Sequence, residues 1–281
     1  MAISLKEQWD AEGYAVVPRI YRNEITARLL PVCEAILEQW RKESPEDGKP
    51  AGGPQATVMR HLNHPGYFKM HPDWKNLILE SVADERVLDV AREVLGEEPM
   101  FRTTSFFFNP TGTSRDGNWH RDSQFRHHDE KEEKVFLERS FGTTSGIQMQ
   151  IALTPSEDIE YVPRSHLRWD TPEEYHIRRA DEQKNNTSNV MPGAIRLKQE
   201  PGDAVLFNPL GLHRGRYHTD KRRRTYMLTY MPASVHYIDY FSHQPWFLST
   251  GYLDGLTRSS RLFFERFIDK YRKDWMGAAV K

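Results

Sequence analysis

The sequence predicts a mainly β-sheet protein with a jelly-roll core and helices packed outside it. Two observations predict this class. Apolar residues recur at helical spacing through much of the first third of the 281-residue chain. From Phe101 onward, short β-type runs separated by turn residues replace that pattern. A last amphipathic helix is expected at Phe263–Lys273.

The N-terminal third is predicted to contain one short strand and three helices. The strand is expected at Tyr14–Val17, and the helices at 22–43, Asp73–Val82 and Asp84–Leu95. Asp73 is a candidate N-cap, and Gly96 ends the third helix. Residues 44–56 are rich in Pro and Gly, so we expect a loop there rather than a linker between domains.

The rest of the chain contains six β-type runs, bounded by turn residues. They are Arg102–Asn109, Gly146–Leu153, Glu160–Val162, Ala194–Leu197, Ala204–Phe207 and Thr225–Met231. Two polar segments, His127–Lys134 and Arg168–Asn189, are best explained as solvated loops. We expect a single domain over 1–281, with a mostly helical part at 1–98, the jelly-roll core at 99–233 and a helical part at 234–281.

Composition excludes several classes of partner. Lys and Arg number 39 against 40 Asp and Glu, so no global charge steers the protein toward nucleic acid or an anionic membrane. Cys33 is the sole cysteine, which excludes an intrachain disulfide and fits a reducing compartment. No run approaches the ~20 apolar residues of a membrane span, and the N-terminus lacks a signal-peptide pattern. We expect a cytoplasmic monomer or homodimer that acts on a small molecule.

A His-x-Asp pair is one half of the metal site that two His and one carboxylate form around Fe(II). The pair occurs four times, as His71/Asp73, His120/Asp122, His127/Asp129 and His218/Asp220. The spacing alone does not choose among them. Only His120 follows a β-type run and a Gly-containing loop, which ends in Trp119 and would place the pair at a barrel mouth.

The segment 201–213 supplies a candidate for the distant His. A tight Pro201-Gly202-Asp203 turn leads into an apolar strand, and an Asn-Pro pair then precedes His213. A lone His after a strand is usually a surface or core residue. Together with His120 and Asp122, however, His213 completes the ligand set of a mononuclear iron site.

The chain resembles the phytanoyl-CoA dioxygenase family of Fe(II)/2-oxoglutarate-dependent oxygenases. The matching segments are Gly13–Val17, Val87–Gly96, Trp119-His120-Arg121-Asp122, Tyr161–His166, Pro201–Phe207, and His213 followed by Arg224, so the resemblance spans most of residues 10–231. It implies a double-stranded β-helix, cupin-like core and Fe(II) bound by His120, Asp122 and His213. It also implies 2-oxoglutarate and O₂ as cosubstrates, succinate and CO₂ as products, and hydroxylation of a small metabolite.

The resemblance also implies which residues bind the cosubstrate. Arg224, eleven residues after His213, matches the basic residue that pairs with the distal carboxylate of 2-oxoglutarate, and an Arg can do so through two hydrogen bonds. Strand alternation would send Arg223 to the opposite face, which leaves Arg222 as the alternative. Ser105 and Gln150 match positions near the cosubstrate. Asp122 favours oxygenation or desaturation, because halogenating relatives lack that carboxylate.

The substrate is left open by two departures from the family pattern. Pro163-Arg164-Ser165-His166 stands where Pro-Gly-Ser-His is usual, and Glu157–Glu160 replaces an Asn-Gly turn. Arg168–Asn189 exceeds the length of an ordinary connection. We interpret it as a lid over a small polar substrate, or else as a surface loop without a role in binding. For the lid, Arg168, Arg178 or Arg179 would meet an anionic group, with Trp119 as an apolar wall.

The sequence also bears on two other functions. His120-Arg121-Asp122 imitates the catalytic-loop tripeptide of protein kinases, but His127 stands where a kinase needs Asn, and the Asp-Phe-Gly and Gly-rich motifs are missing. A jelly-roll binding protein without turnover is the second alternative. Catalytic consumption of 2-oxoglutarate would separate that protein from an enzyme.

Overall fold

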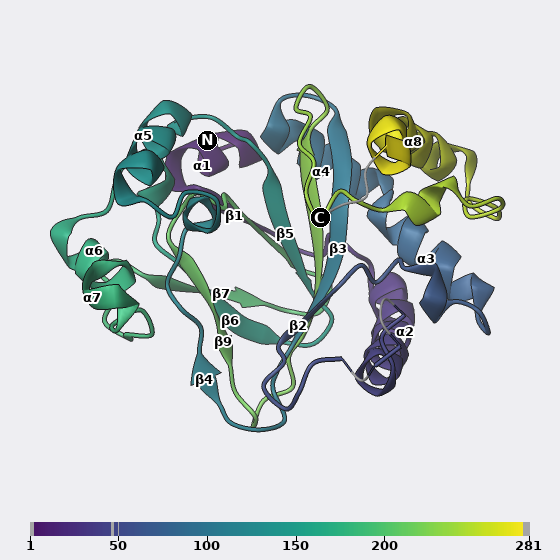
Figure 1. Ribbon diagram of the computed structural model, residues 1–281, viewed down its shortest axis with the longest axis horizontal. Coiled ribbons are helices and arrows are strands. Elements are labelled where there is room, and N and C mark those ends of the chain that lie inside the picture. Colours follow the sequence, from purple (N-terminus) through teal and green to yellow (C-terminus); the bar gives the residue numbers. More distant parts are fainter. Residues whose placement is uncertain (1–2, 46–47, 50, 278–281) are drawn as a thin grey trace.

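Two antiparallel sheets form the centre of the molecule in a computed structural model that describes residues 3–45, 48–49 and 51–277 (Figure 1). The larger sheet has the strand order β1-β8-β5-β10-β3-β2, and the smaller has the order β4-β9-β6-β7. The strands are β1 (Tyr14–Val17), β2 (Val58–Arg60), β3 (Pro99–Phe108), β4 (Arg115–Asp116), β5 (Ile147–Ala152), β6 (Ser156–Tyr161), β7 (Ile195–Gln199), β8 (Ala204–Phe207), β9 (His213–Tyr217) and β10 (Arg224–Pro232). This arrangement confirms the predicted jelly-roll class.

Helices lie outside the sheets. They are α1 (Leu5–Glu12), α2 (Asn23–Lys42), α3 (Pro72–Val82), α4 (Glu85–Leu95), α5 (Glu130–Ser140), α6 (Pro172–Arg178), α7 (Ala180–Gln183) and α8 (Arg258–Gly277), with short 3₁₀ helices η1 (Pro65–Tyr67), η2 (Asp122–Phe125), η3 (Ser165–Leu167) and η4 (Pro245–Leu248). In Figure 1, α2, α3 and α8 lie beside the six-stranded sheet, and α5, α6 and α7 lie at the opposite end of the molecule. None of the helices in the described ranges is long and apolar enough to span a membrane.

The alternation of β10 shows which face of the large sheet is covered. Tyr226, Leu228 and Tyr230 are fully buried in the hydrophobic core that the sheet forms with α2, α3, α4 and α8. Met227 and Thr229 point the other way, into a cavity between the two sheets. The helix-covered face is therefore apolar, and the inner face is mixed.

Most of the predicted elements are present, and several differ. The strand at Tyr14–Val17 and the helices at 22–43 and 84–95 agree with β1, α2 and α4, and Asp84 caps α4. Asp73 is not an N-cap: α3 begins at Pro72, with His71 in the cap position, so Asp73 is in the first turn. In the predicted loop at 44–56, positions 46, 47 and 50 lie outside the described residues, and the others form no helix or strand.

Two predicted loops are in fact helical. The charged segment His127–Lys134 leads into α5, because the Asp129 carboxylate accepts hydrogen bonds from the backbone amides of Lys131 and Glu132 and so caps the helix. Within Arg168–Asn189, Thr171 and Glu174 form a capping box that starts α6.

The sheets also contain strands that were not predicted, namely β2, β4 and β9. β1 pairs with β8 and β2 pairs with β3, so the large sheet takes two strands from the N-terminal third. A single domain over 1–281 stays a prediction.

Candidate metal centre

His120, Asp122 and His213 converge, although about ninety residues of chain separate the two motifs. One side-chain donor atom from each residue lies within 4.8 Å of the other two, and no other cluster of this kind occurs among the residues that the structure describes. Nε2 of His120 lies 3.7 Å, and Nε2 of His213 3.6 Å, from Oδ1 of Asp122. The other three His-x-Asp pairs form no such cluster.

The backbone fixes this arrangement. His120 and His213 form an isolated antiparallel bridge, with N–O distances of 3.1 and 3.0 Å. The amide of Asp122 donates to the carbonyl of Pro209, at 2.9 Å. His213 is the first residue of β9, and Asp122 is the first residue of η2. The loop before β9 is therefore bound directly to the segment that carries the other two ligands.

In each imidazole ring, Nδ1 forms a hydrogen bond with the backbone and Nε2 is available to a metal. Nδ1 of His120 lies 2.7 Å from the carbonyl oxygen of Asn118, and Nδ1 of His213 lies 2.9 Å from that of Gly211. A carbonyl only accepts, so both Nδ1 atoms carry hydrogen and the Nε2 lone pairs remain available. Burial lowers the pKa of His213 to about 4, which keeps this ring neutral near pH 7.

Gln148 orients the carboxylate ligand. Its Nε2 donates to Oδ2 of Asp122 at 2.5 Å, so that Oδ1 faces the two imidazoles. Two imidazole nitrogens and one carboxylate oxygen, all on one side of the metal, are the donors that mononuclear non-haem Fe(II) takes in oxygenases. The residues present therefore fit an Fe(II) ion.

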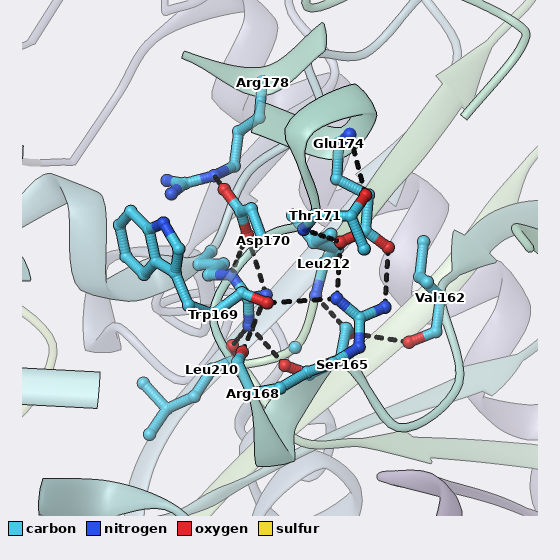
Figure 2. Close-up of polar contacts among 12 residues, drawn as sticks. Val162, Ser165, Arg168, Trp169, Asp170, Thr171, Glu174, Arg178, Leu210 and Leu212 are labelled. Carbon is cyan, nitrogen blue, oxygen red and sulfur yellow. Dashed lines mark hydrogen bonds and ion pairs between the residues drawn. The ribbon is translucent and has the colours of Figure 1, made fainter. Parts of the chain in front are cut away.

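A buried polar network lies behind the metal ligands. Arg121, between His120 and Asp122 in sequence, is fully buried, and its guanidinium donates to the carbonyls of Ser165 (2.7 Å) and Leu210 (2.5 Å). Figure 2 shows Ser165 close to Leu212, and the Ser165 hydroxyl accepts from the Leu212 amide at 2.8 Å. Arg121 and Ser165 thus bind the residues that lead into His213.

Carboxylates neutralise this network. Asp170 pairs with Arg121 on one oxygen and with Arg178 on the other, at 2.8 and 2.6 Å, and Figure 2 shows Asp170 against Arg178. Burial raises the pKa of Asp170, but the two guanidiniums outweigh it and hold the pKa below its ordinary value. Arg178 also pairs with Glu133 of α5 at 3.1 Å. Through these contacts α5 and α6 support the metal loop.

A cavity of about 480 Å³ opens beside the three ligands, between the two sheets. This volume is in the usual range for a site that takes a small molecule. Its wall includes apolar side chains from β2, β3, β6, β8 and β10 and polar side chains from β2, β3, β5, β9 and β10. The lining includes Phe107, Ile159, Phe207 and Met227, the amides Gln148 and Gln150, and the arginines Arg60, Arg102, Arg126 and Arg223.

The predicted cosubstrate residues separate into two groups. Gln150 lines the cavity, and its Oε1 accepts from Nη2 of Arg223 at 3.0 Å. Arg224 is on the opposite face and pairs with Glu34 of α2, at 2.9 Å, so the structure does not place it in the site. Side chains alternate between the two faces here as expected, but Arg223 faces the cavity and Arg224 faces α2. Ser105 accepts from Nη1 of Arg60 at 2.8 Å but does not line the cavity.

The predicted substrate residues and lid also need correction. Trp119 is 1% exposed; its indole donates to the Ser188 carbonyl, and the Arg214 guanidinium covers its ring. Arg168 pairs with Glu174, and Arg178 is fully buried in the network described above. No residue of 168–189 lines the cavity, because α6 and α7 pack behind the metal loop. Arg179 likewise pairs with Glu133 and points away from the site.

Several cavity residues were missed in the sequence. Gln148 could have been found, because it precedes Gln150 by two residues and therefore shares a face of β5. The wall residues Tyr237, Asp239 and Phe241 come from an irregular segment after β10. No periodicity marks that segment.

A family model described as Phytanoyl-CoA dioxygenase (PhyH) matches residues 9–225. The chain belongs to the phytanoyl-CoA dioxygenase family. This confirms the resemblance found in the sequence. Ectoine dioxygenase of Stutzerimonas stutzeri (strain A1501) is 27% identical over 129 residues, which are 45% of this chain and 39% of that relative. The match therefore spans well under half of the relative's length.

Solved structures share the fold at low identity. EctD from S. alaskensis with bound Fe has a TM-score of 0.59 and 18% identity, and the match covers 89% of this chain and 83% of that chain. EctD from S. alaskensis with 2-oxoglutarate and 5-hydroxyectoine has a TM-score of 0.57 and 18% identity, over 93% of this chain and 86% of that chain. At these identities the similarity supports the fold class.

Proposed function

We propose that the protein is an Fe(II)- and 2-oxoglutarate-dependent dioxygenase that hydroxylates a small molecule and releases succinate and CO₂. The observation that carries the proposal is the convergence of His120, Asp122 and His213 on the wall of the cavity between the two sheets. Membership of the phytanoyl-CoA dioxygenase family supports the same reaction class. All three ligands are present, which disfavours a jelly-roll binding protein without turnover.

The protein's own residues would hold and orient the reactants. Nε2 of His120, Nε2 of His213 and Oδ1 of Asp122 would bind Fe(II), with Gln148 fixing the carboxylate. When bound, Fe(II) and 2-oxoglutarate supply the oxidising chemistry, in which O₂ is consumed. The apolar wall around Phe207 and Ile159 keeps water from the reacting atoms.

Arg223 would bind the distal carboxylate of 2-oxoglutarate. Its guanidinium is 1% exposed, and contacts with Gln150 and Thr225 fix its position in the cavity wall. The closest described carboxylate, that of Asp158, is 4.0 Å away, so the charge is not fully paired. A guanidinium held in this way is suited to bind a carboxylate through two hydrogen bonds.

A test of the site compares two His-x-Asp motifs in the same protein. Asp122→Ala should lose bound Fe(II) and succinate formation from 2-oxoglutarate while it keeps its melting temperature. Asp220→Ala, at the exposed acidic position of the His218/Asp220 motif, is the control and should keep both. Loss of iron from the Asp220 variant, with normal iron in Asp122→Ala, would refute the assignment.

The substrate is found by measuring succinate formation by the iron-loaded protein with a panel of small metabolites. Ectoine belongs in the panel, because the relative is described as an ectoine dioxygenase. A stimulated rate identifies the substrate class. We also propose that the protein is a monomer or homodimer and that it is cytoplasmic; the single, buried Cys33 supports a reducing compartment.

A further inference from the structure

We propose that the cavity binds an anionic group of the substrate, a carboxylate or a phosphate, through Arg60 and Arg126. Both belong to the part of the lining that we call the outer wall, which consists of Arg60, Arg102, Arg126, Tyr237, Asp239 and Phe241. This inference rests on the proposed function, because it concerns the same cavity. It assigns a chemical class to the substrate, which neither the family nor the metal ligands define.

Arginines and aromatic rings alternate along this wall. The guanidinium carbon of Arg60 lies 5.2 Å from the ring centre of Phe241, and that of Arg102 lies at the same distance. Arg102 and Arg126 both lie over Tyr237, at 5.6 and 4.2 Å. Because each guanidinium packs on a ring, its position is fixed before a ligand arrives.

Only one of these three cations is neutralised. Arg102 forms an ion pair with Asp239. Arg60 donates to the neutral hydroxyl of Ser105, at 2.8 Å, and none of the carboxylates that the structure describes lies within 4.0 Å of its guanidinium. Arg126, which is exposed, has no ion-pair partner in the described ranges either. The outer wall therefore carries two unpaired positive charges.

A bound metal would reduce the effect of the nearest acidic charge on Arg60. Asp122 is the acidic residue whose charge acts most on Arg60 across the cavity. In the proposed enzyme that carboxylate is a ligand of Fe(II), so its charge is no longer available to Arg60. Arginine stays protonated in proteins, and a half-buried guanidinium without a counter-ion favours an anionic ligand.

Arg126 lies apart from the proposed cosubstrate anchor, whereas Arg60 packs on Phe107, the ring that Arg223 also covers. Arg223 is fixed by Gln150 on the inner strands. Arg126 and the neighbouring Phe125, which is 61% exposed, both line the cavity and face solvent. Arg126 thus lies on the side through which a substrate would enter. Arg60 is less exposed and is connected to Arg126 along the wall through Phe241, Arg102 and Tyr237, whose rings are available to the apolar part of the substrate.

The experiment uses the full protein with anaerobic Fe(II) and saturating 2-oxoglutarate, so that the cosubstrate site is occupied and no turnover occurs. The visible charge-transfer absorbance of the iron–2-oxoglutarate complex verifies that both are bound. Benzoate, phenyl phosphate and the neutral benzamide are then titrated by calorimetry. We expect at least one anion to bind about tenfold or more tightly than benzamide. If benzoate alone binds, the group is a carboxylate; if phenyl phosphate alone binds, it is a phosphate.

Variants of Arg60 test the inference. Arg60→Gln should weaken binding of the anion about tenfold or more while the charge-transfer absorbance is unchanged. Arg60→Lys, which keeps the charge, should retain part of the affinity and guards against a folding defect. Arg272→Gln, on an exposed position of α8, is the control and should change nothing.

Three results overturn the inference. They are equal binding of benzamide and the anions, no binding of any anion, and unchanged anion affinity in Arg60→Gln. Loss of the charge-transfer absorbance in Arg60→Gln alone would reassign Arg60 to the cosubstrate and also overturn it. Absence of that absorbance in the unmodified protein would instead refute the proposed function.

Discussion

Arg121 and Asp170 form an ion pair in which Nη2 and Oδ1 are 2.8 Å apart and both side chains are fully buried. Arg121 lies between two metal ligands in sequence, and its guanidinium also binds the carbonyl that precedes the third ligand by three residues. The ion pair therefore joins both halves of the metal centre to the helical layer formed by α5 and α6.

Replacing Arg121 with Met should destabilise the fold and weaken metal binding together. Asp170 would lose one of its two guanidinium partners in a dry environment, and breaking a buried pair of this kind reduces the free energy of unfolding by about 3–5 kcal/mol. Urea unfolding and Fe(II) titration of the same samples measure the two effects. Ser165→Ala is a milder variant, because it removes only the hydroxyl that accepts from Leu212.

Arg168→Gln is the matched control for the Arg121 variant. Arg168 belongs to the same part of the molecule, but its pair with Glu174 is partly exposed and should contribute under about 1 kcal/mol. A large loss of metal affinity in Arg168→Gln would argue against a specific role for Arg121. So would normal metal binding by Ser165→Ala and Arg121→Met.

Gln148→Leu should weaken Fe(II) binding about 10- to 100-fold, which is the usual effect of losing a group that orients a ligand. The substitution removes the amide that holds Oδ2 of Asp122. Gln39→Leu, on the exposed side of α2, is the control and should bind iron normally. Equal iron affinity in the Gln148 variant would show that Asp122 needs no partner.

Acid should destabilise the protein in part through His61. This side chain is 1% exposed, and burial lowers its pKa to about 3 from an ordinary value of 6.5. The native state keeps His61 neutral while the unfolded state binds a proton below pH 6.5. Stability is therefore complete above pH 6.5 and falls between pH 6.5 and 3, by at most about 1.4 kcal/mol per pH unit.

A variant isolates the contribution of His61 to that slope. His61 has a positive φ of 53°, which Asn tolerates well, so His61→Asn is the suitable substitution. The free energy of unfolding should depend less steeply on pH between 6 and 4 in the variant. Parallel slopes for the two proteins would mean that His61 is not buried in its neutral form.

The metal ligands could be predicted from the sequence because each motif is short and has a local structural context. His120 and Asp122 follow a strand, and His213 follows a turn and an apolar strand, so both ends were found without knowing the long-range pairing. The helix α5 could also have been found, because Asp129 and the acidic first turn are a start signal. The high charge of the segment obscured it.

The outer cavity wall could not be predicted. Tyr237, Asp239 and Phe241 lie in a segment without helix or strand, and tertiary contacts alone bring them to Arg102 and Arg126. The lid hypothesis failed for a related reason. The capping box Thr171–Glu174, with Pro172 at the first helical position, could have been found in the sequence, but the buried acids that hold Arg178 are brought together by tertiary contacts alone.

The phase of β10 favours Arg223 over Arg224 as the cosubstrate residue. In this strand the residues that pack under the helices are the large ones, Tyr226, Leu228 and Tyr230. Arg224 has the same parity and therefore reaches α2, whereas Arg223 has the parity of Met227 and Thr229 in the cavity. The alternation of large side chains along this strand can be read from the sequence. The resemblance to the family, which places the basic residue eleven positions after His213, nevertheless favoured Arg224.

This phase gives a prediction with an internal control. Arg223→Gln should remove a charge-assisted bidentate pair with 2-oxoglutarate, a loss of about 2–4 kcal/mol, and so weaken cosubstrate binding by tens- to several-hundred-fold. Arg224→Gln loses only its contacts outside the cavity, chiefly with Glu34, and should bind 2-oxoglutarate normally. Anaerobic titration of the Fe(II) protein with 2-oxoglutarate measures both. If Arg224→Gln is the impaired variant, the placement of Arg223 as the anchor is wrong; if neither is impaired, another cation of the cavity binds the cosubstrate.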